Sequence, residues 1–194
     1  MKIKEIQDYI PQAQQYYSDV EDYYRSLSFE EAVQNAAQAI IPSGIKSCST
    51  SKTAFASHQR RVGKKKCKEG AEKLLTHPFW SELENAKSFE DIFRVTEKVK
   101  AQTERLGDLW SYDTAQRIAL HKGWYPNEVY LQSGAKDGAK SLVKEGHVKS
   151  LVLKGKRHVK REHFPDILKE LKPYLIENIL CVGKREGWFI NSKL

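Results

Sequence analysis

Apolar residues recur three or four positions apart along most of this chain, and strict alternation of apolar and polar residues is rare. The helical spacing is clear over residues 28–40 and 88–99, where the hydrophobic side chains share one face of a helix. It returns over residues 161–188. Because this period belongs to the α-helix, the pattern predicts an all-α fold, mostly helical, with at most a small β excursion.

Local start and stop signals place the helices. Ser28 with Glu31 matches the S-x-x-E capping box, and an acidic residue also stands three positions after Ser88. Two amphipathic helices, broken at Pro173, are expected to close the chain. In the tyrosine-rich opening segment, Pro11 marks the expected beginning of a second helix.

Further helices are predicted between these signals. A basic helix is expected over Lys64–Leu75, and the segment after Gly107 predicts another helix with Gly123 as its C-terminal cap. Residues 41–61 are rich in Pro, Gly, Ser and Thr and predict a long connection. Residues 147–161 are the only strand-like region, a small excursion or a hairpin.

The chain is long enough to bury a core of its own. Its 194 residues suit one helical domain over 1–194, or two lobes with boundaries at 1–85 and 86–194. In the second case the first lobe holds the N-terminal helices and a basic loop. Hydrophobic residues make up 40% of the chain and charged residues 30%, which disfavours wholesale disorder.

Net charge narrows the class of partner. The chain has 33 Lys and Arg against 25 Asp and Glu, a formal charge of +8. This suits a polyanionic partner such as DNA, although a solvated basic surface gives the same sign. Three cysteines without CxxC spacing, and the lack of a long apolar run, predict a cytoplasmic protein with no disulfide framework, metal site or membrane partner. The oligomeric state is left open.

The densest cluster of cations lies between His58 and Lys68, around Gly63. Lys and Arg neutralise phosphates regardless of base sequence, and the neutral hydrogen-bonding groups nearby suit nucleic acid. The alternative is a solvated basic turn. The residues that we assign to DNA contact here are His58, Gln59, Arg60, Arg61, Lys64, Lys65 and Lys66.

A short turn between two helices is the second candidate for phosphate contact. Residues 104–119 place a glycine turn directly before a helix, which resembles the G-h-G turn of helix-hairpin-helix proteins, whose N–H groups bind phosphate. Leu106 and Gly107 match its second and third positions, and Arg105 replaces the first glycine. We assign Arg105, Leu106, Gly107 and Arg117 to DNA contact. A plain packing corner between two helices is the alternative.

Several motifs together resemble a bacterial family of small helical proteins. They are SHQRR, YDTAQRIA, VYLQSGAKDGA and IENILC, which correspond to HQRR, YDTA, VYL-x-x-G and IE-x-x-LC in that family. The match spans about residues 55–183. More distantly, the chain resembles the helix-hairpin-helix DNA glycosylases, including relatives that excise modified bases as an antiviral defence. The resemblance implies a glycosylase-like helical fold, duplex DNA with a flipped base as the partner, and no cofactor.

The same resemblance implies a reaction and shows a departure from the family pattern. Tyr130 stands where the glycosylases carry an aspartate, and Leu109 is nearest to the lysine of the bifunctional enzymes, so a Schiff-base lyase is not supported. The leading hypothesis is monofunctional hydrolysis with Asp113, because a carboxylate near C1′ of a flipped nucleotide stabilises the cationic sugar. Asp137 and Glu177 are weaker alternatives. The alternative role of Asp113 is to cap its helix.

Aromatic and amide side chains complete the predicted active site. Tyr112, Tyr130 and Trp110 are candidates to stack on an extruded base, with core packing as the alternative. Gln132 and Gln59 have paired donor and acceptor groups that suit a base edge, or that satisfy backbone groups. The residues grouped as catalytic are Asp113, Tyr112, Tyr130 and Gln132.

Three classes of function follow. The first is a DNA glycosylase that leaves an abasic site, with a phage-type glucosylated hydroxymethylcytosine as the substrate that the resemblance suggests. The second is a non-catalytic helix-hairpin-helix module that binds DNA, and the third is an adaptor for RNA or protein. A pocket at Asp113 favours the enzyme, a flat basic face favours the module, and an exposed apolar groove favours the adaptor.

Overall fold

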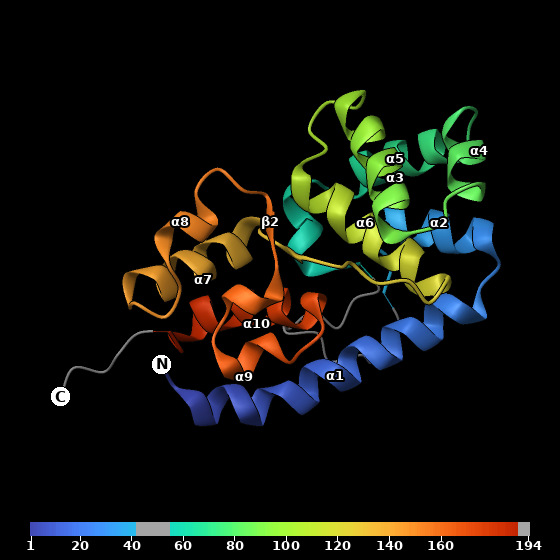
Figure 1. Ribbon diagram of the computed structural model, residues 1–194. Helices are drawn as coiled ribbons and strands as arrows, with labels where there is room; N and C mark the ends of the chain where they lie inside the picture. Colours follow the sequence, from blue (N-terminus) through green and yellow to red (C-terminus); the bar gives the residue numbers. More distant parts are fainter. Residues whose placement is uncertain (42–54, 190–194) are drawn as a thin grey trace. The chain divides into compact units, whose positions relative to one another are not determined.

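The computed structural model describes residues 1–41 and 55–189, and the chain divides into two compact units (Figure 1). Unit 1 holds residues 1–15 and 126–194, and unit 2 holds residues 16–125. In the described residues the elements are helices apart from one two-stranded sheet, which confirms the predicted mostly helical fold with a small β excursion. Over the same ranges, no helix combines the length and the hydropathy that a membrane span requires.

The elements follow the predicted order closely. Unit 2 contains the end of α1 (Ile3–Ser26) and then α2 (Phe29–Ala37), η1 (Ser57–Arg61, a 3-10 helix), α3 (Lys64–Leu74), α4 (Phe79–Glu84), α5 (Phe89–Ala101) and α6 (Asp108–His121). Unit 1 contains the start of α1 and then β1 (Val129–Tyr130), α7 (Ser133–Lys144), α8 (Ser150–Leu153), β2 (His158–Val159), η2 (Arg161–His163), α9 (Asp166–Lys169) and α10 (Pro173–Glu186). The basic helix, the helix after Gly107 and the break at Pro173 are confirmed.

The first helix corrects one expectation. Helix α1 continues through Pro11, where the sequence predicts the beginning of a second helix. A proline inside a helix costs about 3 kcal/mol or more, because it lacks an N–H and its ring clashes with the preceding turn. Buried side chains at helical spacing lie on both sides of it, including Ile6, Ala13 and Tyr17. Their burial, at roughly 1.5–3 kcal/mol for each large apolar side chain, offsets the proline.

Both predicted capping signals are present. The Glu31 N–H donates to Ser28 Oγ at 3.3 Å, and the Ser28 N–H donates to the Glu31 carboxylate at 2.8 Å. At the start of α5, the Asp91 N–H donates to Ser88 Oγ at 3.1 Å. These bonds lower the pKa of both carboxyls: Ser28 lowers that of Glu31, and the Lys87 N–H followed by Ser88 lowers that of Asp91.

Acid is expected to weaken these two caps. A carboxyl whose folded pKa is depressed adds stability that is complete above its unfolded pKa and is lost as the pH falls through its folded pKa. The variant Glu31→Gln/Asp91→Asn should therefore lose less stability than the wild type between about pH 6 and about pH 3. Urea unfolding at both pH values measures this, with Glu30→Gln as the control in the same turn. Equal losses in the wild type and the double variant would contradict the prediction.

Helix α6 is the centre of unit 2. Helices α2 and α5 pack against it, and most of its residues are buried, including Trp110 and Tyr112. A helix buried on nearly all sides needs no polar stripe, which explains why helical periodicity is weak in this segment. The indole N–H of Trp110 donates to the carbonyl of Ala37 at 2.9 Å and ties α6 to the end of α2. The predicted site residues on α6 therefore lie in a packed core.

Unit 1 is built on the packing of α7 against α10. Strand β1 pairs antiparallel with β2, with Val129 opposite Val159 and Tyr130 opposite His158. The strand-like segment predicted over residues 147–161 is a small excursion and not a hairpin, because within it α8 is helical and only the two residues of β2 pair. The partner strand is equally short, since α7 begins soon after it, and the ladder therefore cannot extend.

The contact between α7 and α10 depends on a glycine. A Cβ at Gly138 would lie 2.1 Å from the backbone oxygen of Leu180, which cannot rotate away as a side chain can. Gly138→Ala is expected to lower the free energy of unfolding by about 1–3 kcal/mol, despite the helix propensity of alanine. Chemical denaturation measures the change, and the exposed α7 variant Lys136→Ala should stay within about 0.5 kcal/mol of the wild type. A neutral Gly138→Ala would show that the two helices separate without cost.

Candidate nucleic-acid interface

The predicted hairpin is the turn between α5 and α6. Arg105 has a φ of +69°, in the left-handed region that favours glycine, so the residue that replaces the motif's first glycine keeps a glycine-like backbone. Gly107 is the extended N-cap of α6, and no side chain caps this helix. Leu106 is buried and lies beside Gly70 of α3. The turn therefore has a glycine-like backbone at Arg105, with that side chain exposed and Leu106 in the core.

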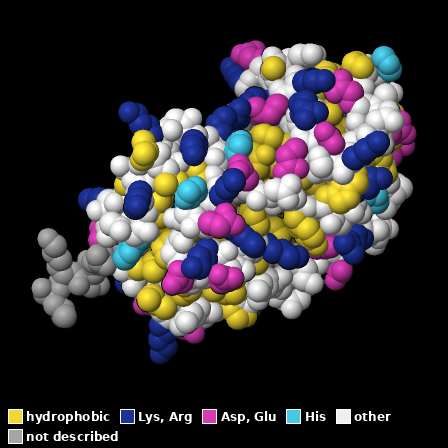
Figure 2. Space-filling model, in the orientation of Figure 1, with side chains coloured by type: hydrophobic (Ala, Val, Ile, Leu, Met, Phe, Trp, Pro, Cys, Tyr) yellow, Lys and Arg dark blue, Asp and Glu magenta, His cyan; other side chains and the backbone are white. Residues whose placement is uncertain are grey.

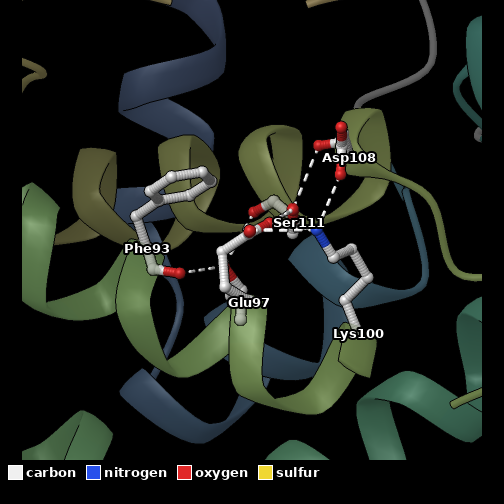
Figure 3. A network of polar contacts seen from close by, with 6 residues as sticks. Phe93, Glu97, Lys100, Asp108 and Ser111 are labelled. Atoms are coloured by element: carbon white, nitrogen blue, oxygen red, sulfur yellow. Dashed lines mark hydrogen bonds and ion pairs between the residues drawn. The ribbon is translucent and has the colours of Figure 1, made fainter. Parts of the chain in front are cut away.

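A polar network surrounds the start of α6 (Figure 3). The ammonium of Lys100 donates to both carboxylate oxygens of Glu97 at 2.9 Å and to Asp108 at 2.6 Å. Ser111 Oγ donates to Glu97 and lies 3.0 Å from the carbonyl oxygen of Asp108. Asp108 thus places a carboxylate in the first turn, where the helix dipole favours negative charge. A phosphate at this helix start would meet that carboxylate, so the site suits an anion less well than the motif alone indicates.

A second helix start carries positive charge that forms no ion pair among the described residues. Arg60, Arg61, Lys64 and Lys65, which we call the basic segment, are all exposed, and none forms an ion pair with another described residue. Gly63, with a φ of +84°, is the N-cap of α3, and no side chain caps this helix. Its first turn contains no acidic residue. Cations in the first turn oppose the helix dipole, and neighbouring like charges repel. An anion bound here would stabilise the segment.

Neighbouring cations differ from the basic segment because acids compensate them. Lys66 pairs with Glu69 at 2.6 Å, and Lys68 lies 3.9 Å from Glu72. On the face of the molecule shown in Figure 2, cationic and acidic side chains are likewise interspersed. Net charge alone therefore does not mark an interface, and the exposed cations without ion pairs among the described residues are the candidate.

Three predicted site residues meet at one carboxylate in the core of unit 2. Gln59 Nε2 donates to Asp113 Oδ2 at 2.6 Å and to the carbonyl of Leu109 at 3.3 Å. Arg117 Nη2 lies 3.7 Å from the same carboxylate oxygen, and Arg117 Nη1 lies 3.5 Å from the carbonyl of Ala36. The exposed fraction is 0% for Gln59, 8% for Asp113 and 5% for Arg117. The cluster joins η1, α2 and α6.

Charge explains why these side chains are buried together. Burial lowers the pKa of Arg117, but the Asp113 carboxylate and the nearby tyrosines, Tyr24 first, outweigh it and raise the pKa overall. Arg117 therefore stays charged and requires Asp113 as its counter-ion. The carboxylate, enclosed by Gln59 and Arg117, offers a flipped nucleotide little surface. The geometry around Asp113 favours a structural role.

The aromatic and amide candidates also lie in packed surroundings. Tyr112 is 1% exposed and meets Phe89 and Phe93 edge-on. Tyr130 and Gln132 belong to unit 1, whereas Asp113 and Tyr112 belong to unit 2. Both residues of unit 1 are buried. Core packing, the alternative to base stacking, accounts for the positions of the two tyrosines.

The other candidates occupy separate positions. Asp137 pairs with Lys140 at 3.3 Å on the exposed side of α7, and Glu177 is half-buried on α10. His58 lies in η1, but its side chain is outside the described residues. Among the side chains that the structure describes, no three His, Cys, Asp or Glu residues lie close enough together to hold a metal ion.

The network at the hairpin was not predicted. Glu97 and Lys100 stand three residues apart, which is the spacing of a helical ion pair, and this was the signal available in the sequence. Partial burial lowers the pKa of Lys100, but its hydrogen bonds to Asp108 and Glu97 outweigh this and raise the pKa overall. The Ser111 contact had no such signal, because it depends on how α5 packs against α6.

Comparisons with models of protein families, with curated proteins and with solved structures found no match to this chain. The resemblance of its motifs to a family therefore stays a prediction. The features that bear on function are the exposed basic segment at the start of α3 and the buried cluster around Asp113.

Proposed function

We propose that this protein binds nucleic acid, with duplex DNA as the expected partner, through phosphate contacts of the basic segment. The observation that carries the proposal is the start of α3, where four exposed cations without ion pairs among the described residues adjoin an uncapped helix N-terminus. Lys and Arg contacts to phosphates require no particular base sequence. The complex is therefore expected to be held mainly by charge.

A phosphate backbone would relieve two unfavourable features of the free protein. Lys64 and Lys65 lie in the first turn of α3, where the helix dipole disfavours cations, and Arg60 and Arg61 add further like charge beside them. Phosphates at this position would pair with the side chains and accept hydrogen bonds from free backbone N–H groups. Binding would also release counterions from the DNA, which adds affinity without base-specific contacts.

The hairpin contributes less in this proposal. Arg105 is exposed, and the carboxylate of Glu104 lies 3.7 Å from its Nε. Asp108 already occupies the first turn of α6. We therefore expect Arg105 to add one phosphate contact, while the basic segment supplies most of the electrostatic attraction.

Base excision by Asp113 stays a prediction from the family resemblance. A catalytic carboxylate must reach the reacting atoms of the flipped nucleotide, whereas Asp113 is engaged by Gln59 and Arg117. This geometry favours the non-catalytic DNA-binding module over the glycosylase.

Fluorescence anisotropy with a labelled DNA duplex at several salt concentrations tests the binding. We expect the logarithm of the association constant to fall linearly with the logarithm of the salt concentration, by about 0.9 for each phosphate contacted. No binding at low salt, or an affinity that does not weaken as salt rises, would overturn the proposal. Single-stranded DNA and duplex RNA, measured in parallel, show which polyanion is preferred.

The same purified protein can be tested for base excision. It is incubated with unmodified, damaged and phage-modified DNA, and abasic sites are then counted. The non-catalytic module is expected to produce none on any of the three. Abasic sites that form with the wild type and disappear with folded Asp113→Asn would establish the glycosylase instead.

A further inference from the structure

A pocket of about 670 Å³ lies in unit 1, which contains none of the residues assigned above to DNA contact. Its walls come from the turn at Gly155, from β2 and from η2. Its volume is in the range of about 300–1,000 Å³ that is usual for small-molecule sites. The cationic and imidazole side chains in its walls are Lys156, Arg157, His158, Lys160 and His163.

The fold holds one imidazole of this pocket in place. His158 stands opposite Tyr130 in the β1–β2 pair, and the centres of the two rings are 5.2 Å apart. The Nδ1 atom of His158 bonds to the carboxylate of Glu128. The backbone beside it is fixed as well, because the Leu131 N–H donates to the carbonyl of Arg157 at 2.8 Å. A wall held in this way loses little freedom when a ligand binds.

Positive charge predominates in the pocket. Lys156, Arg157 and Lys160 face a single carboxylate, Glu128, so the walls carry two net positive charges when the histidines are neutral. Glu128 is already bonded to His158. Lys156 and Lys160 form no ion pair with any residue that the structure describes. The two lysines are therefore available to an anionic ligand.

A neighbouring hollow of about 450 Å³ continues the same wall. It shares Glu128, Lys160 and His163 with the pocket and adds Asn127 and the acidic residue Glu162. The Glu162 carboxylate lies 3.4 Å from Nε of Arg161, which compensates its charge. The second hollow therefore holds two carboxylates and one lysine, and the net positive charge is confined to the first pocket.

We propose that this pocket binds a phosphate monoester group. Such a group carries about two negative charges near neutral pH and has three acceptor oxygens. It matches the two net positive charges of the walls and the ammonium donors of Lys156 and Lys160. A simple carboxylate, with one charge and two oxygens, would satisfy fewer of these donors. The remaining volume admits a group as large as a nucleoside.

The phosphate can belong to a small phosphorylated compound or to the phosphorylated end of a nucleic acid, since both present the same chemical group. The site uses no residue of the basic segment. The proposal is therefore independent of the proposed function, and either can fail without the other.

Two-dimensional amide NMR of the full chain tests the proposal, with inorganic phosphate, adenosine 5′-monophosphate and adenosine as probes. We expect both phosphate probes to shift the amides of residues 155–163 saturably and adenosine to leave them unchanged. A short oligonucleotide with and without a 5′-phosphate distinguishes the two sources. Tighter binding of the phosphorylated end at these amides assigns the pocket to nucleic-acid ends, and equal binding assigns it to small phosphorylated compounds.

Charge removal supplies the matched comparison. Lys156→Gln/Lys160→Gln is expected to weaken the binding of adenosine 5′-monophosphate about tenfold or more, because two charge-assisted contacts are lost. Lys136→Gln, an exposed change on α7, should bind as the wild type does, and so should Lys64→Gln/Lys65→Gln in the basic segment.

Both pocket lysines are exposed, so the variant is expected to stay folded, which its amide spectrum checks directly. The single variant Lys160→Gln, with half of the charge change, is the second test and should weaken binding by a smaller factor. No saturable shift with either phosphate probe, equal shifts with adenosine, or unchanged affinity in the pocket variants would overturn the proposal.

Discussion

The variant Asp113→Asn is expected to lower the free energy of unfolding by about 3–5 kcal/mol, the usual cost of breaking a buried ion pair from one side. Arg117, with 5% of its surface exposed, would lose its carboxylate partner inside the core. Asparagine keeps the shape of the side chain and an acceptor for Gln59. The loss of stability therefore measures the removal of the charge and not the creation of a cavity. The contact from Arg117 to the carbonyl of Ala36, at 3.5 Å, is long and has no full negative charge, so it does not replace the carboxylate.

Urea unfolding of matched variants measures this loss. Asp108→Asn removes a carboxylate from the same helix, but its ion pair with Lys100 lies near the surface and should be worth about 1 kcal/mol or less. Asp113→Leu/Arg117→Met removes both buried charges and is expected to be more stable than Asp113→Asn. If Asp113→Asn cost no more than Asp108→Asn, Asp113 would not be the group that stabilises buried Arg117.

The same variant separates a structural carboxylate from a catalytic one. A structural Asp113 predicts that Asp113→Asn unfolds more easily but, under conditions where it is folded, binds DNA as the wild type does. A catalytic Asp113 predicts the opposite pattern, in which the reaction is lost while stability changes little. Base excision and stability measured on one preparation therefore decide between the two roles.

The helix starts could be predicted because their signals are local. The bonds between Ser28 and Glu31 join residues three positions apart, so the capping box is visible in the sequence itself. The prediction that a second helix begins at Pro11 was wrong, because the burial that keeps α1 continuous depends on distant parts of the chain. The match of Arg105 to a glycine position of the hairpin motif stays a prediction, but its left-handed backbone is of the kind that glycine favours.

The buried cluster could be predicted only in part. Asp113 and Arg117 stand four residues apart, with the acid first, which is the favourable order for an ion pair on one helix. Gln59 is 54 residues from Asp113, and nothing local indicates that η1 packs on α6. Periodicity also failed to show that this helix is buried on nearly all sides, because a buried helix lacks the contrast between apolar and polar faces. Residues assigned to a DNA surface therefore proved to lie in a core.

The pocket of unit 1 illustrates the same limit. The cations of residues 155–163 are visible in the sequence, but the carboxylate that orients His158 comes from Glu128, 30 residues earlier. Whether Glu128 and His158 lie side by side depends on the register of β1 against β2, which pair over only two residues on each strand. Register between short strands is weakly specified by alternation alone. Local charge was therefore predictable, whereas its arrangement around a pocket was not.

Neutralising the basic segment is expected to change the salt dependence of DNA binding more than any other surface substitution in unit 2. Replacing Arg60, Arg61, Lys64 and Lys65 with glutamine should reduce the slope of log K against log salt by about 3–4, since each phosphate contact contributes about 0.9. The affinity at low salt should fall about a hundredfold or more. Anisotropy titrations at matched salt concentrations measure both quantities.

A smaller, matched pair of variants shows whether position or net charge is responsible. Lys64→Gln/Lys65→Gln and Arg94→Gln/Lys98→Gln remove the same charge from exposed helical positions, but the second pair already has acidic partners, Asp91 and Glu82. Local phosphate contact predicts that the first change lowers the slope by about 2 and the second leaves it nearly unchanged. Equal effects would mean that the protein attracts DNA through its overall charge. In that case the start of α3 would lose its special role, because its uncapped N–H groups and unpaired cations would add nothing beyond their sign.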